Sequence, residues 1–285
     1  MTRLSIRRFQ STTGTSDISP KSPLFCRRVF RLARLVALAI LLVGRPEFAA
    51  AQSAAQILVG AGDIASCDAD KSQATALLLD KIPGTVFTAG DNVYPDGTAR
   101  EFRQCYGPSW GRHRERTRPA PGNHDYESEQ AAPYFKYFGA NAGPTGRGYY
   151  SYDLGAWHVV SLNSVAKAPS WGKQQEEWLA KDLAASLSAC KLAYWHHPYV
   201  SSGKNHGNSP HMGNLFAILY RHGADFVVSG HDHIYERFAP QDANAKADAR
   251  GIRQFIAGTG GELLYEIGTV KPNSEVRNGT THGVL

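Results

Sequence analysis

Short apolar stretches alternating with helical segments are the feature that most constrains the fold of this chain. The stretches are four to six residues long and rich in Val, Ile, Tyr and Phe, which is typical of buried strands. They are expected at 56–60, 84–89, 148–152, 158–162, 191–195, 225–229 and 254–257. Because helical segments separate several of these strands, the pattern predicts a layered α/β domain.

Three segments between the strands have the composition and spacing of helices. They are expected at 72–81, 174–187 and 214–222. The second repeats Leu at four-residue spacing, and the third ends before Gly223, a residue type that commonly terminates helices. Residues 107–147 lack such periodicity and are rich in Pro, Gly and Arg, so they are predicted to form loops.

The first 51 residues differ in composition from the remainder and are interpreted as a signal peptide with a long basic lead. Nine Lys or Arg residues precede or flank an apolar run at 35–43, and Ala49, Ala50 and Ala51 follow it as a small-residue cleavage region. The run has nine residues, fewer than the roughly 20 that a membrane-spanning helix requires. We therefore expect a secreted or periplasmic protein that is not stably inserted in a membrane after cleavage.

Removal of this leader changes the charge of the protein. The whole chain carries a formal net charge of +6, whereas residues 52–285 contain 22 basic and 23 acidic residues. The remaining domain therefore gives no reason to expect a nucleic acid polymer as partner. Residues 52–285 suit a single catalytic domain, and their sequence leaves the oligomeric state undetermined. A new apolar pattern begins at the last residues, so either the chain is truncated there or these residues form a frayed edge.

Three cysteines follow the leader, and an exported location permits a disulfide. Cys67 and Cys105 each follow a polar loop, so a bridge between them is the favoured pairing. Cys190 opens an apolar strand and is expected to be a buried thiol. The alternative is three free thiols.

Polar clusters stand at the ends of several apolar runs. They occupy 62–64, 90–94, 122–125, 195–198 and 230–233. Open α/β folds place ligands at the carboxyl ends of strands, and these clusters supply carboxylate, phenol, amide and imidazole groups, which suit iron, manganese and zinc. One such cluster alone is more often an ordinary turn, but five in succession predict a metal site.

The order of these clusters resembles that of the calcineurin-like metallophosphoesterases, and more narrowly of the purple acid phosphatases, across about residues 56–262. Where the wider superfamily usually has a histidine two residues after Asp63, this chain has Ala65. Tyr94, in a Gly-Asp-x-x-Tyr arrangement, takes the place of that ligand, and the run from Gly230 to Arg237 is also similar. The resemblance implies a four-layer α/β/β/α sandwich with two mixed sheets flanked by helices and a metal site at strand C-terminal ends.

The resemblance also implies a dinuclear centre. The first ion, typically Fe(III), would be bound by Asp63, Asp91, Tyr94 and His233. The second, Fe(II), Zn or Mn, would be bound by Asp91, Asn123, His196 and His231, with Asp91 as the bridge. His196 is preferred to His197 because it stands two residues before Pro198. A phenol binds metal only as phenolate, so Tyr94 favours a strongly acidic ion such as Fe(III).

Such a centre implies a hydrolase for small phosphate esters. Two cations could bind substrate oxygens and generate a metal-bound hydroxide that attacks a phosphate monoester, while a histidine protonates the leaving group. His124, beside Asn123, is the first candidate for this histidine. His206, ten residues after His196, is the second candidate, and the alternative for it is an ordinary loop histidine.

Two other functions compete with this reading. A phosphodiesterase or a nucleotide hydrolase could use the same site, since the loops at 108–121 and 166–172 that would select the substrate have no shape derivable from sequence. A non-catalytic metal- or phosphate-binding protein would be expected to lack His124 or an open metal position, and the sequence shows neither loss.

Overall fold

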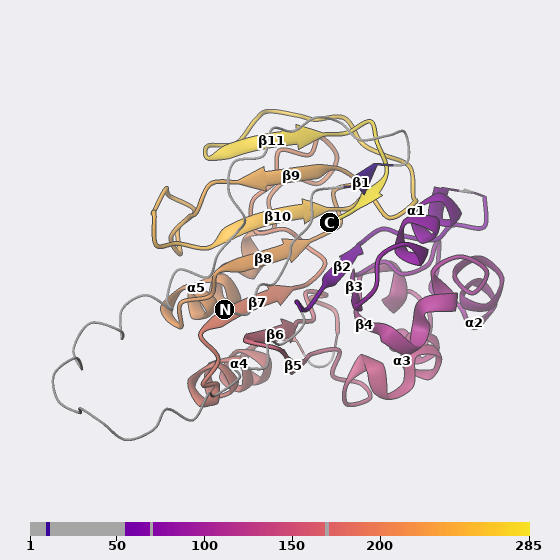
Figure 1. Cartoon of the computed structure of the whole chain (residues 1–285), viewed down its shortest axis with the longest axis horizontal. Helices are drawn as coiled ribbons and strands as arrows, with labels where there is room; N and C mark the ends of the chain where they lie inside the picture. Colours follow the sequence, from indigo (N-terminus) through magenta and orange to yellow (C-terminus); the bar gives the residue numbers. More distant parts are fainter. Residues whose placement is uncertain (1–9, 12–54, 69–70, 169–170) are drawn as a thin grey trace, which may run out of the picture.

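The computed structural model describes residues 10–11, 55–68, 71–168 and 171–285 (Figure 1). The predicted signal peptide therefore lies outside the described residues, apart from β1 (Gln10–Ser11), which pairs antiparallel with β12 (Gly283–Val284). Within the described ranges no helix has both the length and the apolar composition needed to span a membrane.

A small parallel sheet forms the first half of the domain. Its three strands, in the order β2-β3-β4, are β2 (Leu58–Ala61), β3 (Thr85–Ala89) and β4 (Thr117–Ala120). The register aligns Ala61 with Thr88, and Ala89 with Ala120, so that the three strands end at one edge. The loops after these strands consequently lie together.

A larger mixed sheet forms the second half, with the order β11-β9-β10-β8-β7-β6-β5. Its strands are β5 (Tyr150–Leu154), β6 (Trp157–Ser161), β7 (Cys190–Tyr194), β8 (Phe226–Ser229), β9 (Tyr235–Phe238), β10 (Arg253–Ala257) and β11 (Ser274–Asn278). The neighbours β6, β7, β8 and β10 are parallel, whereas β5, β9 and β11 are added antiparallel. The expectation of two mixed sheets therefore needs correction, because the described pairs of the smaller sheet are all parallel.

Helices cover the outer faces of the two sheets. Figure 1 shows α1 (Lys71–Asp80), α2 (Ala99–Glu101) and α3 (Ala132–Phe138) beside the small sheet, with α4 (Lys173–Ala185) and α5 (Gly213–Arg221) on the opposite side of the molecule. Leu179 and Leu183 of α4 are buried against the large sheet, as their spacing predicts. The domain thus has the expected α/β/β/α layers, and all three predicted helices and all seven predicted strands are present within two residues of their expected bounds.

The core between the sheets is apolar and holds them at a fixed separation. It includes Leu58, Phe87, Ala89, Ala120, Trp157, Val159, Leu192, Tyr194, Phe226 and Phe255. A second core lies between the small sheet and its helices, and a third lies between the large sheet and its helices. Because ligand loops leave both sheets, this central core sets the distance across the site.

The prediction that residues 107–147 form loops is wrong. They contain β4 and α3, together with short 3₁₀ segments at Trp110–Arg116, His124–Tyr126, Glu129–Ala131 and Gly139–Ala142. Aromatic packing rather than periodicity orders α3, since Tyr134 and Phe138 are buried and stack edge-on to each other. β4 tolerates Pro119 because, among the described strands, it pairs with β3 alone and lies at the edge of its sheet.

Cys67 and Cys105 form the expected disulfide, which joins the loop after β2 to the π-helical turn Phe102–Tyr106. Cys190 is buried at the start of β7 as predicted, but it is not a free thiol, so that part of the prediction is wrong. The last residues are not a frayed edge, because Leu285 exchanges hydrogen bonds of 2.9 and 3.1 Å with Gly60 of β2.

Candidate metal centre

The structure brings the seven predicted ligands together at the carboxyl ends of five strands. Asp63 follows β2, Asp91 and Tyr94 follow β3, Asn123 follows β4, His196 follows β7, and His231 and His233 follow β8. The three-stranded sheet therefore supplies the oxygen donors, and the seven-stranded sheet supplies the imidazoles. This placement agrees with the rule that loops at the carboxyl ends of strands bind ligands.

One group of donor atoms converges on the phenol of Tyr94. Its hydroxyl lies 2.9 Å from Asp63 Oδ1, 3.0 Å from Asp91 Oδ2 and 3.2 Å from His233 Nε2. A single hydroxyl proton cannot satisfy all of these acceptors at once. Their convergence is what a shared cation would resolve, and these are the four residues expected to bind the first ion.

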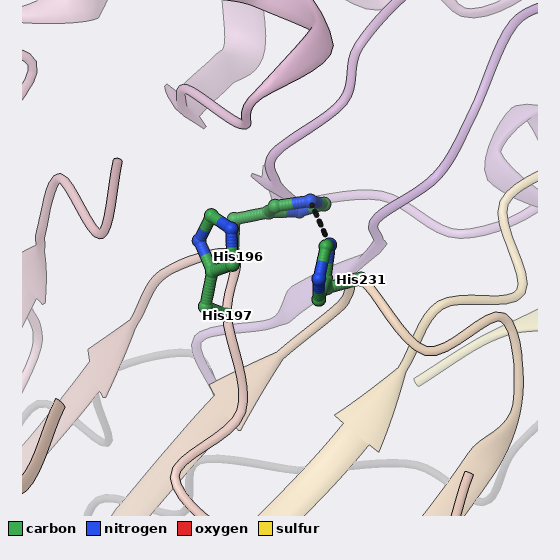
Figure 2. A group of neighbouring side chains, drawn as sticks. All are labelled: His196, His197 and His231. Atoms are coloured by element: carbon green, nitrogen blue, oxygen red, sulfur yellow. Dashed lines mark hydrogen bonds between the residues drawn. The ribbon is translucent and has the colours of Figure 1, made fainter. Parts of the chain in front are cut away.

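A second group converges on His196. Its Nε2 lies 3.1 Å from Asp91 Oδ2, 3.0 Å from Asn123 Oδ1 and 3.1 Å from His231 Nδ1. Figure 2 shows the rings of His196 and His231 facing each other across this contact, in a T-shaped arrangement with an interplanar angle of 72°. Asp91 belongs to both groups, which is the position a bridging carboxylate must occupy.

Backbone carbonyls orient two of the imidazoles. His196 Nδ1 donates to the carbonyl of Ala89 at 2.9 Å, and His233 Nδ1 donates to the carbonyl of Leu263 at 2.6 Å. Both rings therefore direct Nε2 into the site. Metal-binding histidines are commonly fixed in this way through their second ring nitrogen.

The loop backbone is strained where the site requires it. Asp63, Asp91 and His231 have φ values of 60°, 47° and 70°, a left-handed region that costs residues other than glycine free energy and is concentrated at functional sites. Glycine is needed beside them. A Cβ at Gly122 would lie 2.1 Å from Asp91 Oδ1, and one at Gly90 would lie 2.5 Å from His196 Cβ.

The carboxylates are buried without a permanent cation. Asp63 and Asp91 are 0% and 1% exposed, and within the described chain only histidines come within ion-pair distance of them. Burial disfavours the charged forms of both Asp91 and His196. The attraction between these two side chains nevertheless lowers the pKa of Asp91 and raises the pKa of His196 to about 9. Isolated buried charges are costly unless paired or bound to metal.

The chemistry of this donor set fits two metal ions. Burial and the adjacent carboxylates raise the pKa of Tyr94 well above its ordinary value, so a phenolate there requires a neighbouring cation. One side chain atom each of Asp63, Asp91 and His196 lie within 4.8 Å of one another. Carboxylate, phenolate, amide and imidazole donors without thiolate suit iron, zinc and manganese.

His197 lies beside the centre, where one of its ring nitrogens is within 4.8 Å of ring nitrogens of His196 and His231 (Figure 2). Its Nδ1 is 2.8 Å from the hydroxyl of Ser164, which also accepts a hydrogen bond from the His197 backbone N–H at 2.9 Å. Its ring packs against His231 at 4.3 Å. Since His196, and not His197, contacts Asp91 and Asn123, the geometry favours His196 as the ligand of the pair.

The two candidate catalytic histidines flank the centre. His124 Nδ1 donates to the carbonyl of Pro95 at 2.5 Å, and its Nε2 lies 3.9 Å from Asp91 Oδ2. His206 is exposed and stacks on His231, with the ring centroids 4.0 Å apart. Both side chains can therefore reach a substrate from the solvent side of the ligands.

Two buried carboxylates that support the loops were missed at the sequence level. Asp125 accepts hydrogen bonds from the backbone N–H groups of Asn92 and Gly122, while burial and the nearby Asp91 raise its pKa to about 7. Asp232 accepts hydrogen bonds from His206 and Gly207. Their signal was present, because each is an acidic residue within two positions of a predicted ligand.

Residues 41–235 match the sequence model of the calcineurin-like phosphoesterases. The chain belongs to this family. Within it the chain is similar to purple acid phosphatase 15 of Arabidopsis thaliana, with 29% identity over 220 residues, which are 65% of this chain and 41% of that protein. Purple acid phosphatase 21 of the same plant is 36% identical over 118 residues, which are 40% of this chain and 26% of that protein.

Solved structures show the same fold. A purple acid phosphatase from yellow lupin (Lupinus luteus) seeds superposes with a TM-score of 0.62 at 18% identity, covering 80% of this chain and 48% of that one. GAP50, described as the anchor in the inner membrane complex of Plasmodium, superposes with a TM-score of 0.62 at 12% identity, covering 80% of this chain and 79% of that one. The chain spans only 41% and 26% of the length of the two plant relatives.

Proposed function

We propose that this domain is an exported hydrolase of phosphate monoesters that binds two metal ions, Fe(III) together with Fe(II), Zn or Mn. The observation that carries the proposal is the convergence of donors on two points that share Asp91. The similarity to purple acid phosphatases supports the choice of reaction. When bound, the ions would neutralise charge on the phosphate and activate water.

The protein's own residues would prepare the site for that chemistry. Asp63, Asp91, Tyr94 and His233 would hold the first ion, and Asp91, Asn123, His196 and His231 the second. Five of these ligands are buried, which limits access of bulk water and would strengthen their interaction with the bound charge, whereas Asn123 and His231 are partly exposed. The fixed imidazoles avoid reorganisation when substrate binds.

His124 is our first candidate for the proton donor to the leaving group. Its Nδ1 hydrogen bond to Pro95 holds the ring so that Nε2 faces the centre beside Asp91. His206 is the second candidate and lies on the other side, over His231. Replacing each by alanine separates them, because loss of the true donor slows an alkyl phosphate far more than an aryl phosphate, whose leaving group needs less protonation.

Elemental analysis and a visible spectrum of the purified mature protein test the metal assignment. We expect two metal ions per chain and an absorption band from iron bound to tyrosinate that disappears in Tyr94→Phe. A colourless, iron-free and active enzyme would refute the role of Tyr94. Absence of turnover after loading with iron, zinc and manganese would refute the enzymatic proposal.

Hydrolysis of phosphodiesters is the second candidate activity. A protein described as a probable cyclic nucleotide phosphodiesterase, from Vesicomyosocius okutanii, is 28% identical over 120 residues, which are 40% of this chain and 47% of that protein. Comparison of phenyl phosphate, bis-p-nitrophenyl phosphate and a cyclic nucleotide decides between the two. A kcat/KM higher for either diester than for the monoester would favour the diesterase.

A further inference from the structure

Three imidazoles lie together at the ends of β7 and β8, and one of them has no part in the proposed reaction. One ring nitrogen each of His196, His197 and His231 lie within 4.8 Å of one another (Figure 2). The ring centroids are 4.9 Å apart for His196 and His197, and 4.3 Å apart for His197 and His231. We call this group the histidine cluster. Two of its members are predicted ligands of the second ion, so His197 alone is left without a role.

Hydrogen bonds orient His197 in the same way as a ligand. Its Nδ1 lies 2.8 Å from the hydroxyl of Ser164, a fully buried residue. A hydroxyl oxygen can accept two hydrogen bonds, so that of Ser164 can accept from Nδ1 as well as from the backbone N–H of His197. Metal-binding histidines are commonly fixed through their second ring nitrogen, as His196 is by the carbonyl of Ala89. This arrangement leaves Nε2 of His197 for a metal ion.

The distances between the nitrogens suit a single tetrahedral ion. His196 Nε2 lies 3.1 Å from His231 Nδ1. Two imidazole nitrogens bound to one tetrahedral zinc ion are about 3.3 Å apart, and three imidazoles are a sufficient set of protein ligands for such an ion. Since a ring nitrogen of His197 is within 4.8 Å of both, a shift of at most about 1.5 Å completes a site of three imidazoles.

A metal ion can reach the histidine cluster from solvent. His197 and His231 are partly exposed, and the ring of the exposed His211 lies 5.3 Å from that of His197. The exposed His206 stacks on His231 with the ring centroids 4.0 Å apart. An ion arriving from this side meets imidazoles before it meets the buried carboxylates of the centre.

The donor atoms distinguish the histidine cluster from the position predicted for the second ion. That position includes oxygens of Asp91 and Asn123, which suit ions such as Mn²⁺, whereas the cluster offers nitrogen alone. Imidazole suits copper, nickel and zinc, and among the divalent ions of the first transition series Cu²⁺ generally binds a given site most tightly. The cluster therefore favours Cu²⁺.

We propose that His196, His197 and His231 bind Cu²⁺ at a site that overlaps the position of the second ion. An ion at either place needs His196 and His231, so the two places cannot be occupied together. Cu²⁺ bound to the cluster would therefore displace the second ion and inhibit the enzyme. The inhibition rests on the proposed hydrolase function, whereas binding of Cu²⁺ does not.

Electron paramagnetic resonance of Cu²⁺ titrated into the purified, metal-loaded protein tests the site. We expect three nitrogen ligands to copper and release of one other ion for each Cu²⁺ bound, as measured by elemental analysis. Ser164→Ala should weaken Cu²⁺ binding about tenfold, because loss of a partner that fixes a ligand costs about 10–100-fold in metal affinity. His197→Gln removes the ligand itself, so the loss should reach the order of 100-fold, with two nitrogen ligands left. His222→Gln, at a partly exposed histidine after α5, is the matched control and should bind Cu²⁺ like the wild type.

Asn123→Ala separates the histidine cluster from the position of the second ion. Because Asn123 belongs to that position alone, this variant should hold less of the second ion and still show three nitrogen ligands to Cu²⁺. Two nitrogen ligands in the wild type, or wild-type Cu²⁺ affinity in both His197→Gln and Ser164→Ala, would overturn the proposal.

Inhibition tests the overlap of the two sites. The Cu²⁺ concentration that halves turnover of phenyl phosphate, taken relative to each protein's own uninhibited rate, should rise in His197→Gln by the factor by which its Cu²⁺ affinity falls. Equal inhibition of wild type and variant would show that the sites do not overlap. If no phosphate ester is hydrolysed, the hydrolase proposal fails, and the spectra and affinities still decide whether the cluster binds copper.

Discussion

The two halves of the metal centre are supported in different ways. Loops of the three-stranded sheet carry the oxygen donors and are tied to one another by the Cys67–Cys105 disulfide and by the buried carboxylate of Asp125. Loops of the seven-stranded sheet carry the imidazoles, and the backbone carbonyls of Ala89 and Leu263 orient two of them, His196 and His233. We refer to these as the oxygen half and the imidazole half.

The difference shows what each kind of ligand needs. Short carboxylate side chains give a ligand oxygen little reach, so the loop backbone that carries them must itself be fixed. Imidazoles extend further and have a second nitrogen, so a single hydrogen bond to a carbonyl can fix the ring. The halves meet where Asp91 contacts His196 at 3.1 Å, and where Asp63 accepts a hydrogen bond from the N–H of His231 at 2.9 Å.

The largest expected effect is at the point shared by both halves. Asp91→Ala removes the carboxylate common to the Tyr94 and His196 groups, so both ions should be lost and kcat/KM should fall on the order of 1,000-fold or more. Metal content and turnover of phenyl phosphate measure this. Asp96→Ala, exposed and five positions further along, is the control. Retention of both ions in Asp91→Ala would show that the halves bind metal independently.

A smaller effect is expected within the oxygen half. Asp125→Asn replaces a carboxylate oxygen with an amide donor that faces the N–H groups of Asn92 and Gly122, so the loops after β3 and β4 should loosen. Changes of this kind around a metal site cost about 10–100-fold in affinity or activity. Metal titration of this variant beside Asp68→Asn, an exposed position, measures the loss. Equal metal affinities of the two variants would show that Asp125 does not support the metal centre.

Loss of the disulfide should lower the stability of the protein and should loosen the oxygen half alone. Cys67→Ser with Cys105→Ser opens a bridge that spans 38 positions of sequence, and the free energy of unfolding should fall by about 2–4 kcal/mol. In hydrogen exchange, residues 62–68 should lose protection while residues 226–233 keep theirs. Equal loss in both segments would mean that the two halves are not supported separately.

The smallest effect is expected far from the centre, in the layer outside the large sheet. His158 contacts Asp182 of α4 at 2.7 Å and Asp153 of β5 at 2.9 Å, and these bonds raise its pKa although burial opposes the shift. A raised pKa in the folded state gives stability that is complete below about pH 6.5 and is lost as pH rises through the folded pKa.

With an allowance for solvent screening, the contribution of His158 is about 1 kcal/mol. His158→Gln should therefore lower the unfolding free energy at pH 5.5 and change it little at pH 9, as measured by urea titration. Metal content should stay at the wild-type level, because α4 carries none of the predicted ligands. Loss of metal in this variant would mean that the outer layer also positions the imidazole half.

The sequence predicted the strands with strong apolar patterns but not the elements made by packing. The short apolar runs at β3, β7 and β8 are strong enough in the local sequence to predict a strand at each of these positions. β4 contains Arg118 and Pro119, which argue against a strand unless it is known to lie at an edge. Position in the sheet is a property of the whole fold, and no local pattern encodes it.

The residues of the site were likewise predictable where a local motif marks them and not where a distant contact decides their role. The sequence predicted that ligands in tight motifs lie close together, because the carboxyl ends of neighbouring parallel strands meet at one edge of a sheet even where the loop conformations are unknown. His196 could be preferred to His197 only through its distance from Pro198, and the contact of His197 with Ser164 depends on a residue 33 positions away. The groove between loop 203–208 and segment 266–271 was not predicted, since only the folded chain shows that these two segments lie close together.

Asp232 has a consequence for how such a domain could diversify. It is fully buried between two predicted ligands, and its side chain accepts hydrogen bonds from the backbone N–H groups of His206 and Gly207 in the loop between β7 and α5. Residues beyond this anchor can change in length and charge while the ligands keep their places. Variation of residues 204–205 and of segment 266–271, with His206 retained, would therefore change the surface beside the centre while the predicted ligands stay in place.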